Sequence, residues 1–472
     1  MDWAIFLGKW TRKSGHVIAS IISSLVFLWL DFLETVLCVF YRNVDKLWEG
    51  SVSTAASSCY CRKSQGKGAK SSDRESLLSD TLFSTCRKNV WREMGLLNLL
   101  RKWNWEDEVV EDHDDNEKKE EENPGMGEKE IERVRWSDCS CDSCASWISA
   151  SNRRLRVVVN QPSTGREGDD NDEDTIFEGK KETENVIFVH GFLSSSSIWT
   201  ETVFPNLEQK NNNYRMFAVD LLGFGESPKP RECLYTLRDH LQMIEKSVIQ
   251  PFQLSSFHLV AHSMGCVIAL ALSAHYASSV KSLTLIAPPY FRSSPSERDR
   301  ESASMRALRG LADRKIWPPL LFGSAVMSWY EHLGRCVCFL ICRNHRIWEW
   351  ILKRLNKTSD LQLFVDLTRH THHSAWHTMH NVICGGAELM DEYLESLKDP
   401  KVPIHVVQGN RDNVVPLECS SNIKIKVPHA QVKIIPNADH TTVILNRAKD
   451  VTRDLLYIWA SAADNIREDC SL

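Results

Sequence analysis

Residues 257–276 read FHLVAHSMGCVIALALSAHY, in which a short apolar strand pattern leads through a turn into an apolar helix pattern. The turn, AHSMG at residues 261–265, matches the G-x-S-x-G type of motif that projects a serine hydroxyl above the edge of a sheet. Small residues are needed two positions before and two after the serine, because the sharp turn brings neighbouring backbone close. Ala261 replaces the first glycine and adds one methyl group, which we expect to fit. The motif therefore predicts Ser263 as a nucleophile.

Short β-branched runs recur on both sides of this turn, and the intervals between them hold helical patterns. The runs lie at residues 154–159, 185–189, 214–219, 257–261, 281–286, 402–407 and 431–435. Strands that alternate with helices predict an α/β fold with a mostly parallel central sheet flanked by helices. A final helix is expected over residues 444–463, because apolar residues repeat there on one face.

A long insertion separates the fifth of these strands from the sixth. Residues 293–399 are too many for a loop and show helical patterns, so they predict a helical cap inserted into a core of residues 154–292 and 400–472. Lys and Arg outnumber Asp and Glu by 11 to 4 between residues 300 and 357, which would suit an anionic head group. The cap is also rich in tryptophan, which suits a substrate with a long apolar part, although most of these rings are expected to pack the cap onto the core.

Two later loops hold the partners that a serine nucleophile requires. Asp412 follows the sixth strand and His440 follows the seventh, so both should lie at the edge of the sheet where parallel strands end. The chain order serine, acid, histidine is the one expected for this motif. We predict His440 as the general base and Asp412 as the residue that orients it. Asp439 is the competing acid, but a chain neighbour rarely reaches the ring of the adjacent histidine.

The sequence VHGF ends the second strand and holds the candidate oxyanion site. Acyl transfer needs two backbone N–H groups aimed at the developing negative charge. Met264, directly after the nucleophile, should supply one, and Phe192 the other. His190 and Gly191 form the supporting loop in this interpretation, and the alternative is a turn that only ends a strand.

The 15 cysteines and a group of histidines raise the possibility of a metal site. Cys139, Cys141 and Cys144 are close in sequence, but the next cysteine, Cys233, lies far along the chain and no second ligand pair follows at a zinc-like spacing. The histidines at positions 370, 372, 373, 377 and 380 lack a clear acidic third ligand. We therefore expect no metal and no cofactor, and we expect buried thiols with one or two disulfides.

Residues 1–45 are typical of a signal peptide or a membrane anchor. A basic lead precedes an apolar run at residues 17–30, which is shorter than the ~20 residues that span a bilayer. No clear cleavage site follows closely, so a cleaved signal and a retained anchor both stay open. Acylation of Cys38, Cys59 or Cys61 would strengthen an anchor.

Residues 46–153 do not show the pattern of a packed domain. An acidic run at residues 106–132 cannot bury enough apolar surface to offset chain entropy, which predicts a low-order linker. The formal net charge of −5 argues against a dedicated nucleic-acid-binding protein.

Taken together, the motifs resemble the α/β-hydrolase superfamily over about residues 154–468. The pieces VIFVHGF, DLLGFGES, AHSMG, GNRD and NADH occur in the order typical of that family. More narrowly, the segment VHGFLSSSSIWT, the AHSMG turn and the cysteine-bearing apolar amino end look like the plant BODYGUARD group of probable lysophospholipases, which is associated with formation of the cuticle.

The resemblance implies a serine esterase that is exported to the cell wall or anchored at the plasma membrane. Its implied partner is an acyl lipid or cutin precursor. An acyltransferase that uses the same acyl-enzyme and a non-catalytic scaffold remain alternatives. The oligomeric state stays open.

Overall fold

The computed structural model describes residues 29–30, 32–49, 134–148, 154–162, 183–208, 213–291, 330–355, 358–398 and 402–469. Several predicted features lie outside these residues: most of the apolar run at 17–30, Cys59 and Cys61, the acidic run at 106–132, and the first part of the cap.

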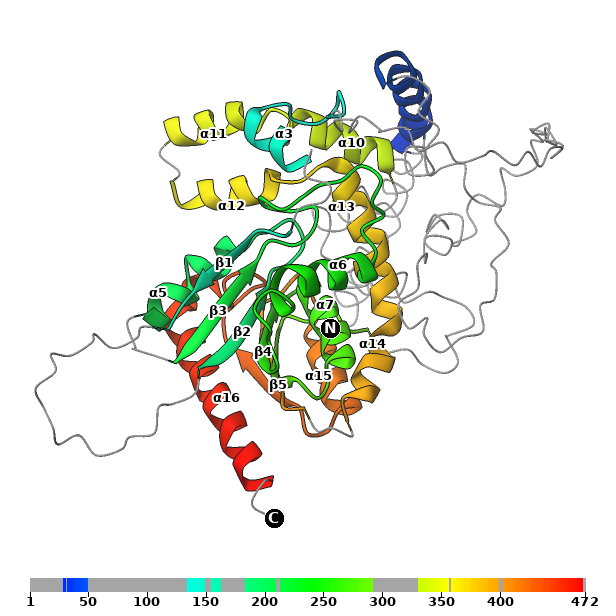
Figure 1. Ribbon diagram of the computed structural model, residues 1–472. Coiled ribbons are helices and arrows are strands. Elements are labelled where there is room, and N and C mark those ends of the chain that lie inside the picture. The colour runs from blue at the N-terminus through cyan, green and yellow to red at the C-terminus, as the bar shows by residue number, and fades with distance from the viewer. Residues whose placement is uncertain are drawn as a thin grey trace, which may run out of the picture.

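A seven-stranded sheet forms the centre of the molecule (Figure 1). Its order is β1 (Val157–Asn160), β3 (Tyr214–Val219), β2 (Glu184–Val189), β4 (Phe257–His262), β5 (Val280–Ile286), β6 (Ile404–Gly409) and β7 (Gln431–Ile435). Only β1 runs antiparallel to its neighbour, and the other pairs are parallel. The predicted α/β class and all seven predicted strands are confirmed.

Helices cover both faces of the sheet, so each face has its own apolar core. One face packs against α6 (Leu237–Ile244), α7 (Met264–His275), α14 (Gly385–Ser396) and α15 (Leu417–Lys426). The opposite face packs against α4 (Ser197–Thr200), α5 (Val203–Glu208) and α16 (Ala448–Asp469). Parallel strands covered on both sides are buried along their length, and all six residues of β4 are buried here, including His258 and His262.

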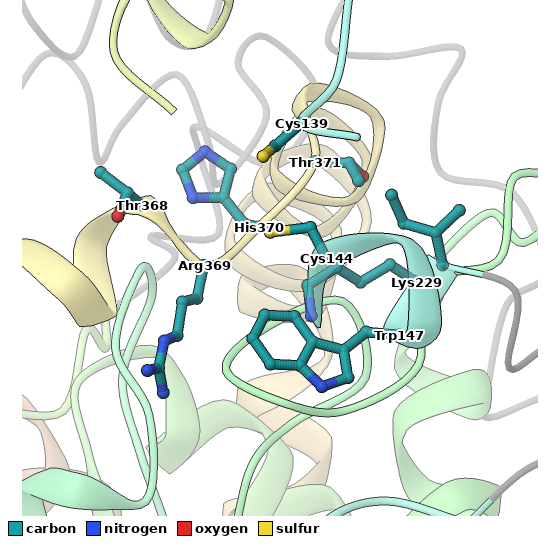
Figure 2. Close-up of a pocket in the computed structure, with 9 residues that line it drawn as sticks. Cys139, Cys144, Trp147, Lys229, Thr368, Arg369, His370 and Thr371 are labelled. Carbon is teal, nitrogen blue, oxygen red and sulfur yellow. The ribbon is translucent and has the colours of Figure 1, made fainter. Parts of the chain in front are cut away.

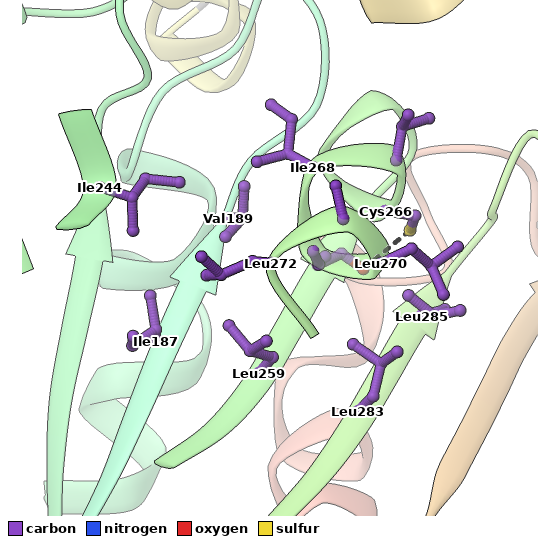
Figure 3. Close-up of a cluster of buried hydrophobic side chains, with 14 of the residues drawn as sticks. Ile187, Val189, Ile244, Leu259, Cys266, Ile268, Leu270, Leu272, Leu283 and Leu285 are labelled. Atoms are coloured by element: carbon purple, nitrogen blue, oxygen red, sulfur yellow. Dashed lines mark hydrogen bonds between the residues drawn. The ribbon is translucent and has the colours of Figure 1, made fainter. Parts of the chain in front are cut away.

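Helix α7 is apolar on every side because it is enclosed on every side. It lies on the middle of the sheet and is overlaid by α6 and α14. Figure 3 shows Ile268 and Leu272 of α7 above Ile187 of β2, Leu259 of β4 and Leu283 of β5. This packing holds the amino end of α7 rigidly at the carboxyl edge of the sheet.

The described residues of the predicted cap are helical. They form α10 (Glu331–Leu340), α11 (His345–Arg354), α12 (Thr358–Thr368) and α13 (His372–Thr378), and the chain then continues through a π-helical stretch into α14. Figure 1 shows α3 (Asp142–Ile148), from the range predicted to be a linker, beside α10 and α11.

An amino-terminal helix at residues 32–49 docks on α10. The Glu34 carboxylate accepts hydrogen bonds from the backbone N–H groups of His332 and Leu333 at 2.8 and 3.0 Å, which satisfies donors at the start of α10. Asp45 pairs with both terminal nitrogens of Arg335 at 2.7 and 2.8 Å. Among the helices that the structure describes, none combines the length and hydrophobicity needed to cross a membrane.

Candidate active site

The turn between β4 and α7 carries Ser263 in a strained backbone conformation. Its φ of 53° and ψ of −123° are unusual for a residue with a side chain, and such strain persists only where the surroundings enforce it. A Cβ at Gly265 would lie 2.5 Å from the carbonyl oxygen of His190, so only glycine fits there. The methyl group of Ala261 is fully buried without disrupting the turn, as expected from the sequence.

The structure brings Ser263, His440 and Asp412 into one hydrogen-bonded chain. The Ser263 hydroxyl lies 3.0 Å from Nε2 of His440, and Nδ1 of the same ring lies 2.8 Å from Oδ2 of Asp412. Each residue follows a different strand, and the three meet at the shared carboxyl edge of the sheet. A base within hydrogen-bond reach of the nucleophile and a carboxylate behind the base form the arrangement that activates a serine.

Asp412 is buried, and its carboxylate is held by several donors. Its Oδ1 atom accepts the backbone N–H groups of Val414 and Val415, each at 2.8 Å. Its Oδ2 atom accepts the side-chain amide of Gln408 at 2.9 Å in addition to the His440 ring. A buried charge requires such partners, and these also aim the carboxylate at the ring. Gln408 was not identified from the sequence, because a glutamine at a strand end has no distinctive signature.

Asp439, the competing acid, is engaged elsewhere. Its Oδ1 atom accepts backbone N–H groups from Thr441 at 3.0 Å and Thr442 at 2.8 Å. These hydrogen bonds, with the one from Thr442 the largest contribution, lower the pKa of Asp439. The carboxylate therefore shapes the loop that carries His440 and does not contact the ring.

His262 is a second residue that the sequence did not single out, although it stands inside the AHSMG motif. Its Nε2 atom lies 2.9 Å from the backbone carbonyl oxygen of His440 and donates to it. Burial, together with the nearby His440 ring, lowers the pKa of His262 to about 3. The neutral ring thus fixes the backbone of the histidine that faces the nucleophile.

The loop after β2 lies tightly against the nucleophile. His190 is buried and bridges two backbone groups, donating from Nδ1 to the Gly191 carbonyl at 2.7 Å and accepting the Leu221 N–H at 2.9 Å. Burial lowers the pKa of His190, which keeps the ring neutral. A Cβ at Gly191 would lie 3.2 Å from Cβ of Ser263, so glycine allows the close approach. His190 and Gly191 therefore support the site.

Of the two predicted oxyanion donors, Met264 directly follows Ser263, and Phe192 directly follows Gly191 in the loop after β2. Met264 is buried at the start of α7, and the ring of Phe192 packs on Phe224 with centroids 5.7 Å apart. Their role as donors to an oxyanion remains a prediction.

Hydrogen bonds join the cap to the segment that follows the loop of His190 and Gly191. Asp366 of α12 accepts hydrogen bonds from the hydroxyls of Ser195, at 3.0 Å, and of Ser197. Burial raises the pKa of Asp366, against the opposing effect of these hydrogen bonds. Arg369 of the cap adds a salt bridge of 3.0 Å to Glu226. The cap is therefore attached to two loops at the same edge of the sheet as Ser263.

Comparison with known proteins agrees with this architecture. Residues 184–446 match the family model described as the alpha/beta hydrolase fold. The chain is 45% identical to "Probable lysophospholipase BODYGUARD 4" of Arabidopsis thaliana, over 95% of this chain and 99% of the relative. It is 42% identical to BODYGUARD 5 (96% and 98% covered) and 38% identical to BODYGUARD 1 (92% and 94%) of the same plant, which carry the same description. The chain therefore belongs to the α/β-hydrolase family and, within it, to the BODYGUARD group of probable lysophospholipases.

Proposed function

We propose that the protein is a serine esterase that cleaves acyl esters of lipids through an acyl-enzyme. The observation that carries this proposal is the hydrogen-bonded chain from Ser263 through His440 to Asp412, with distances of 3.0 and 2.8 Å. A hydroxyl is a poor nucleophile until a base removes its proton, and here the base is already in contact with it.

In the first step Oγ of Ser263 attacks the ester carbonyl carbon while its proton passes to Nε2 of His440. The negative charge that develops on the carbonyl oxygen is stabilised by the backbone N–H groups of Phe192 and Met264. The carbon–oxygen bond to the alcohol then breaks, and His440 returns the proton to the leaving alcohol. Asp412 keeps Nδ1 of the ring protonated and stabilises the imidazolium that forms.

In the second step a water molecule attacks the acyl carbon and transfers a proton to His440. The bond to Ser263 breaks, the serine oxygen regains the proton, and a fatty acid leaves. Attack by an acceptor alcohol in place of water would instead transfer the acyl group.

A lipid substrate is supported by the names of the relatives and by the composition of the cap. The relatives are described as probable lysophospholipases. The basic excess of the cap would attract an anionic head group, and its tryptophans suit an acyl chain. We infer a lysophospholipid or cutin-precursor ester, and a role in building the plant cuticle.

We further propose that the protein is exported and stays attached to the plasma membrane or cell wall through a retained amino-terminal segment. Glu34 and Asp45 of this segment are bound to the cap, which favours a retained anchor over a cleaved signal. Its helix also exposes large apolar side chains, each at least 48% exposed: Phe32, Val36, Val39, Phe40, Leu47 and Trp48. Such a surface is suited to contact with lipid.

Labelling with a fluorophosphonate probe tests the catalytic proposal. The purified chain should form an adduct on Ser263 and release fatty acid from lysophosphatidylcholine, and Ser263→Ala should do neither. Ser396→Ala, a change at the far end of α14, is the matched control and should retain both properties. Full hydrolysis by Ser263→Ala would overturn the proposal, and absence of an adduct in the unmodified chain would favour the scaffold alternative. Acyl-glycerol formed in the presence of glycerol would identify a transferase.

A further inference from the structure

Four potential metal ligands from two distant parts of the chain meet outside the candidate active site. Cys139, Cys141 and Cys144 come from the segment at residues 134–148, and His345 opens α11 of the cap. One ligand atom from each of these residues lies within 4.8 Å of the others. Three thiols and one imidazole are a donor set of structural zinc sites.

The distances within this group agree with tetrahedral coordination. Nε2 of His345 lies 3.7 Å from Sγ of Cys141 and 3.6 Å from Sγ of Cys144. With Zn–S and Zn–N bonds of about 2.3 and 2.05 Å at tetrahedral angles, a sulfur and a nitrogen ligand are separated by about 3.6 Å. Cys141 and Cys144 are therefore already spaced from His345 as ligands of one ion, and Cys139 lies within 4.8 Å of the same atoms.

A carboxylate orients the histidine for metal binding. Oε1 of Glu349, one helical turn along α11, lies 2.7 Å from Nδ1 of His345. The ring therefore carries its proton on Nδ1 and presents the lone pair of Nε2 to the sulfurs. Zinc-binding histidines commonly donate their second N–H to a carboxylate in this way. Sγ of Cys139 also accepts the backbone N–H of Cys141 at 3.5 Å, a contact that suits a thiolate.

A second group of donors lies next to the first. Cys338 and Cys342 each place Sγ 3.6 Å from Nε2 of His370. Figure 2 shows His370 lining the same pocket as Cys139 and Cys144. Among the residues that the structure describes, this second group has three ligands, one fewer than a closed tetrahedral site needs.

We propose that Cys139, Cys141, Cys144 and His345 bind a structural zinc ion that joins the segment before the hydrolase core to the cap. All four coordination positions are filled by protein, so the ion has no open position for chemistry. It would fix α3 against α11 and so help to hold the cap in place. This inference is independent of the proposed esterase activity, because none of the four residues belongs to the catalytic chain.

The competing state of these thiols is a disulfide, which the sequence favours for an exported protein. A disulfide would leave His345 and its paired carboxylate without a function. The zinc site accounts for all three cysteines, for the histidine and for Glu349 together.

Elemental analysis of the full-length chain, purified without a metal-affinity tag and dialysed against a weak chelator, tests the proposal. We expect at least one zinc per chain and the loss of one zinc in Cys141→Ser and in His345→Ala. Cys336→Ser is the matched control, because it lies on α10 beside Cys338 but outside both groups, and it should keep the full zinc content. Far-ultraviolet circular dichroism of each variant reports whether the chain remains folded.

Replacement of the zinc by cobalt(II) gives a readout that needs no variant. A tetrahedral site with three thiolates should show intense sulfur-to-cobalt charge-transfer absorption and visible d–d bands. A second zinc in the unmodified chain, retained in both variants, would place another ion at Cys338, Cys342 and His370 and still support the proposal. Zinc-free protein, or a disulfide between any two of Cys139, Cys141 and Cys144 found by peptide mapping without reduction, would overturn it.

Discussion

The ring of His262 donates a hydrogen bond to the backbone carbonyl of His440 over 2.9 Å, so the residue before Ser263 holds the backbone of the histidine that contacts the Ser263 hydroxyl. The two imidazoles are adjacent, with centroids 4.8 Å apart, but only the His440 ring contacts the serine hydroxyl. Because His262 is neutral and buried, it acts as a fixed donor and not as a second base.

We expect His262→Phe to lower kcat about 10- to 100-fold with little change in KM, because loss of a buried hydrogen bond costs roughly 1–3 kcal/mol in the positioning of His440. His262→Gln keeps a donor near the same place and should restore much of the rate. Steady-state kinetics of both variants on a lysophospholipid check this prediction. Equal losses in both variants, or an effect on KM alone, would contradict a positioning role.

Removal of the charge on Asp412 should be far more damaging than removal of the charge on its competitor. Asp412→Asn is expected to lower turnover by about 10⁴, because the ring would lose its orientation and its stabilising carboxylate. Asp439→Asn is the matched control and should cost much less, since the Asp439 carboxylate binds groups of its own loop, namely the backbone N–H groups of Thr441 and Thr442 and the Thr441 hydroxyl. Comparable losses in the two variants would show that the assignment of Asp412 as the orienting acid is wrong.

The hydrogen-bonded contact between the cap and the core can be tested at Asp366. In Asp366→Ala the hydroxyls of Ser195 and Ser197 lose their acceptor, so α12 should separate from the core more often. We expect faster hydrogen exchange in α12 and in the loop after β2, together with a higher KM. Asp450→Ala, at an exposed site on α16, serves as the control. Unchanged exchange in Asp366→Ala would show that other contacts hold the cap.

Buried neutral histidines should make the protein sensitive to acid. His240 of α6 is buried, its ring nitrogens have no hydrogen-bond partner among the described residues, and burial lowers its pKa to about 4. Below pH ~6.5 the unfolded chain takes up a proton that the folded chain cannot, so stability falls by up to ~1.4 kcal/mol per pH unit until the folded pKa is reached.

His240→Leu should therefore flatten the dependence of stability on pH between about 6.5 and 4, because it removes this proton uptake. At pH 7.5 the variant should be as stable as the parent, since leucine suits the apolar site. Urea unfolding at several pH values measures the difference. An identical slope in the two proteins would mean that His240 is not responsible.

Glu349 should tune the affinity of the proposed zinc site without supplying a ligand. Glu349→Gln is expected to weaken zinc binding about 10- to 100-fold, because the His345 ring loses its carboxylate partner. Chelator competition measures the affinity, and the unfolding temperature should fall when the chelator removes the ion. Unchanged affinity would show that Glu349 does not orient His345.

The strand pattern and the AHSMG turn were sufficient to predict the sheet and the order of the site residues. Parallel strands covered on both faces give apolar runs in the sequence. Glycine is required at position 265 because a Cβ there would lie 2.5 Å from the backbone oxygen of His190. Both signals are local. Asp412 and His440 were found because the fold places strand ends at one edge.

By itself, then, the sequence predicted the hydrolase core and singled out Ser263, His440 and Asp412, which the structure brings into contact, because these predictions depend on short-range periodicity and on chain order. Only the tertiary structure showed that His262 and Gln408 position those groups, and only folding brought His345 to the three cysteines some 200 residues before it in the sequence. The first two contacts depend on how the loops at the edge of the sheet fold together, and the last on how the cap packs against residues 134–148. Residue spacing along the chain carries no information about either.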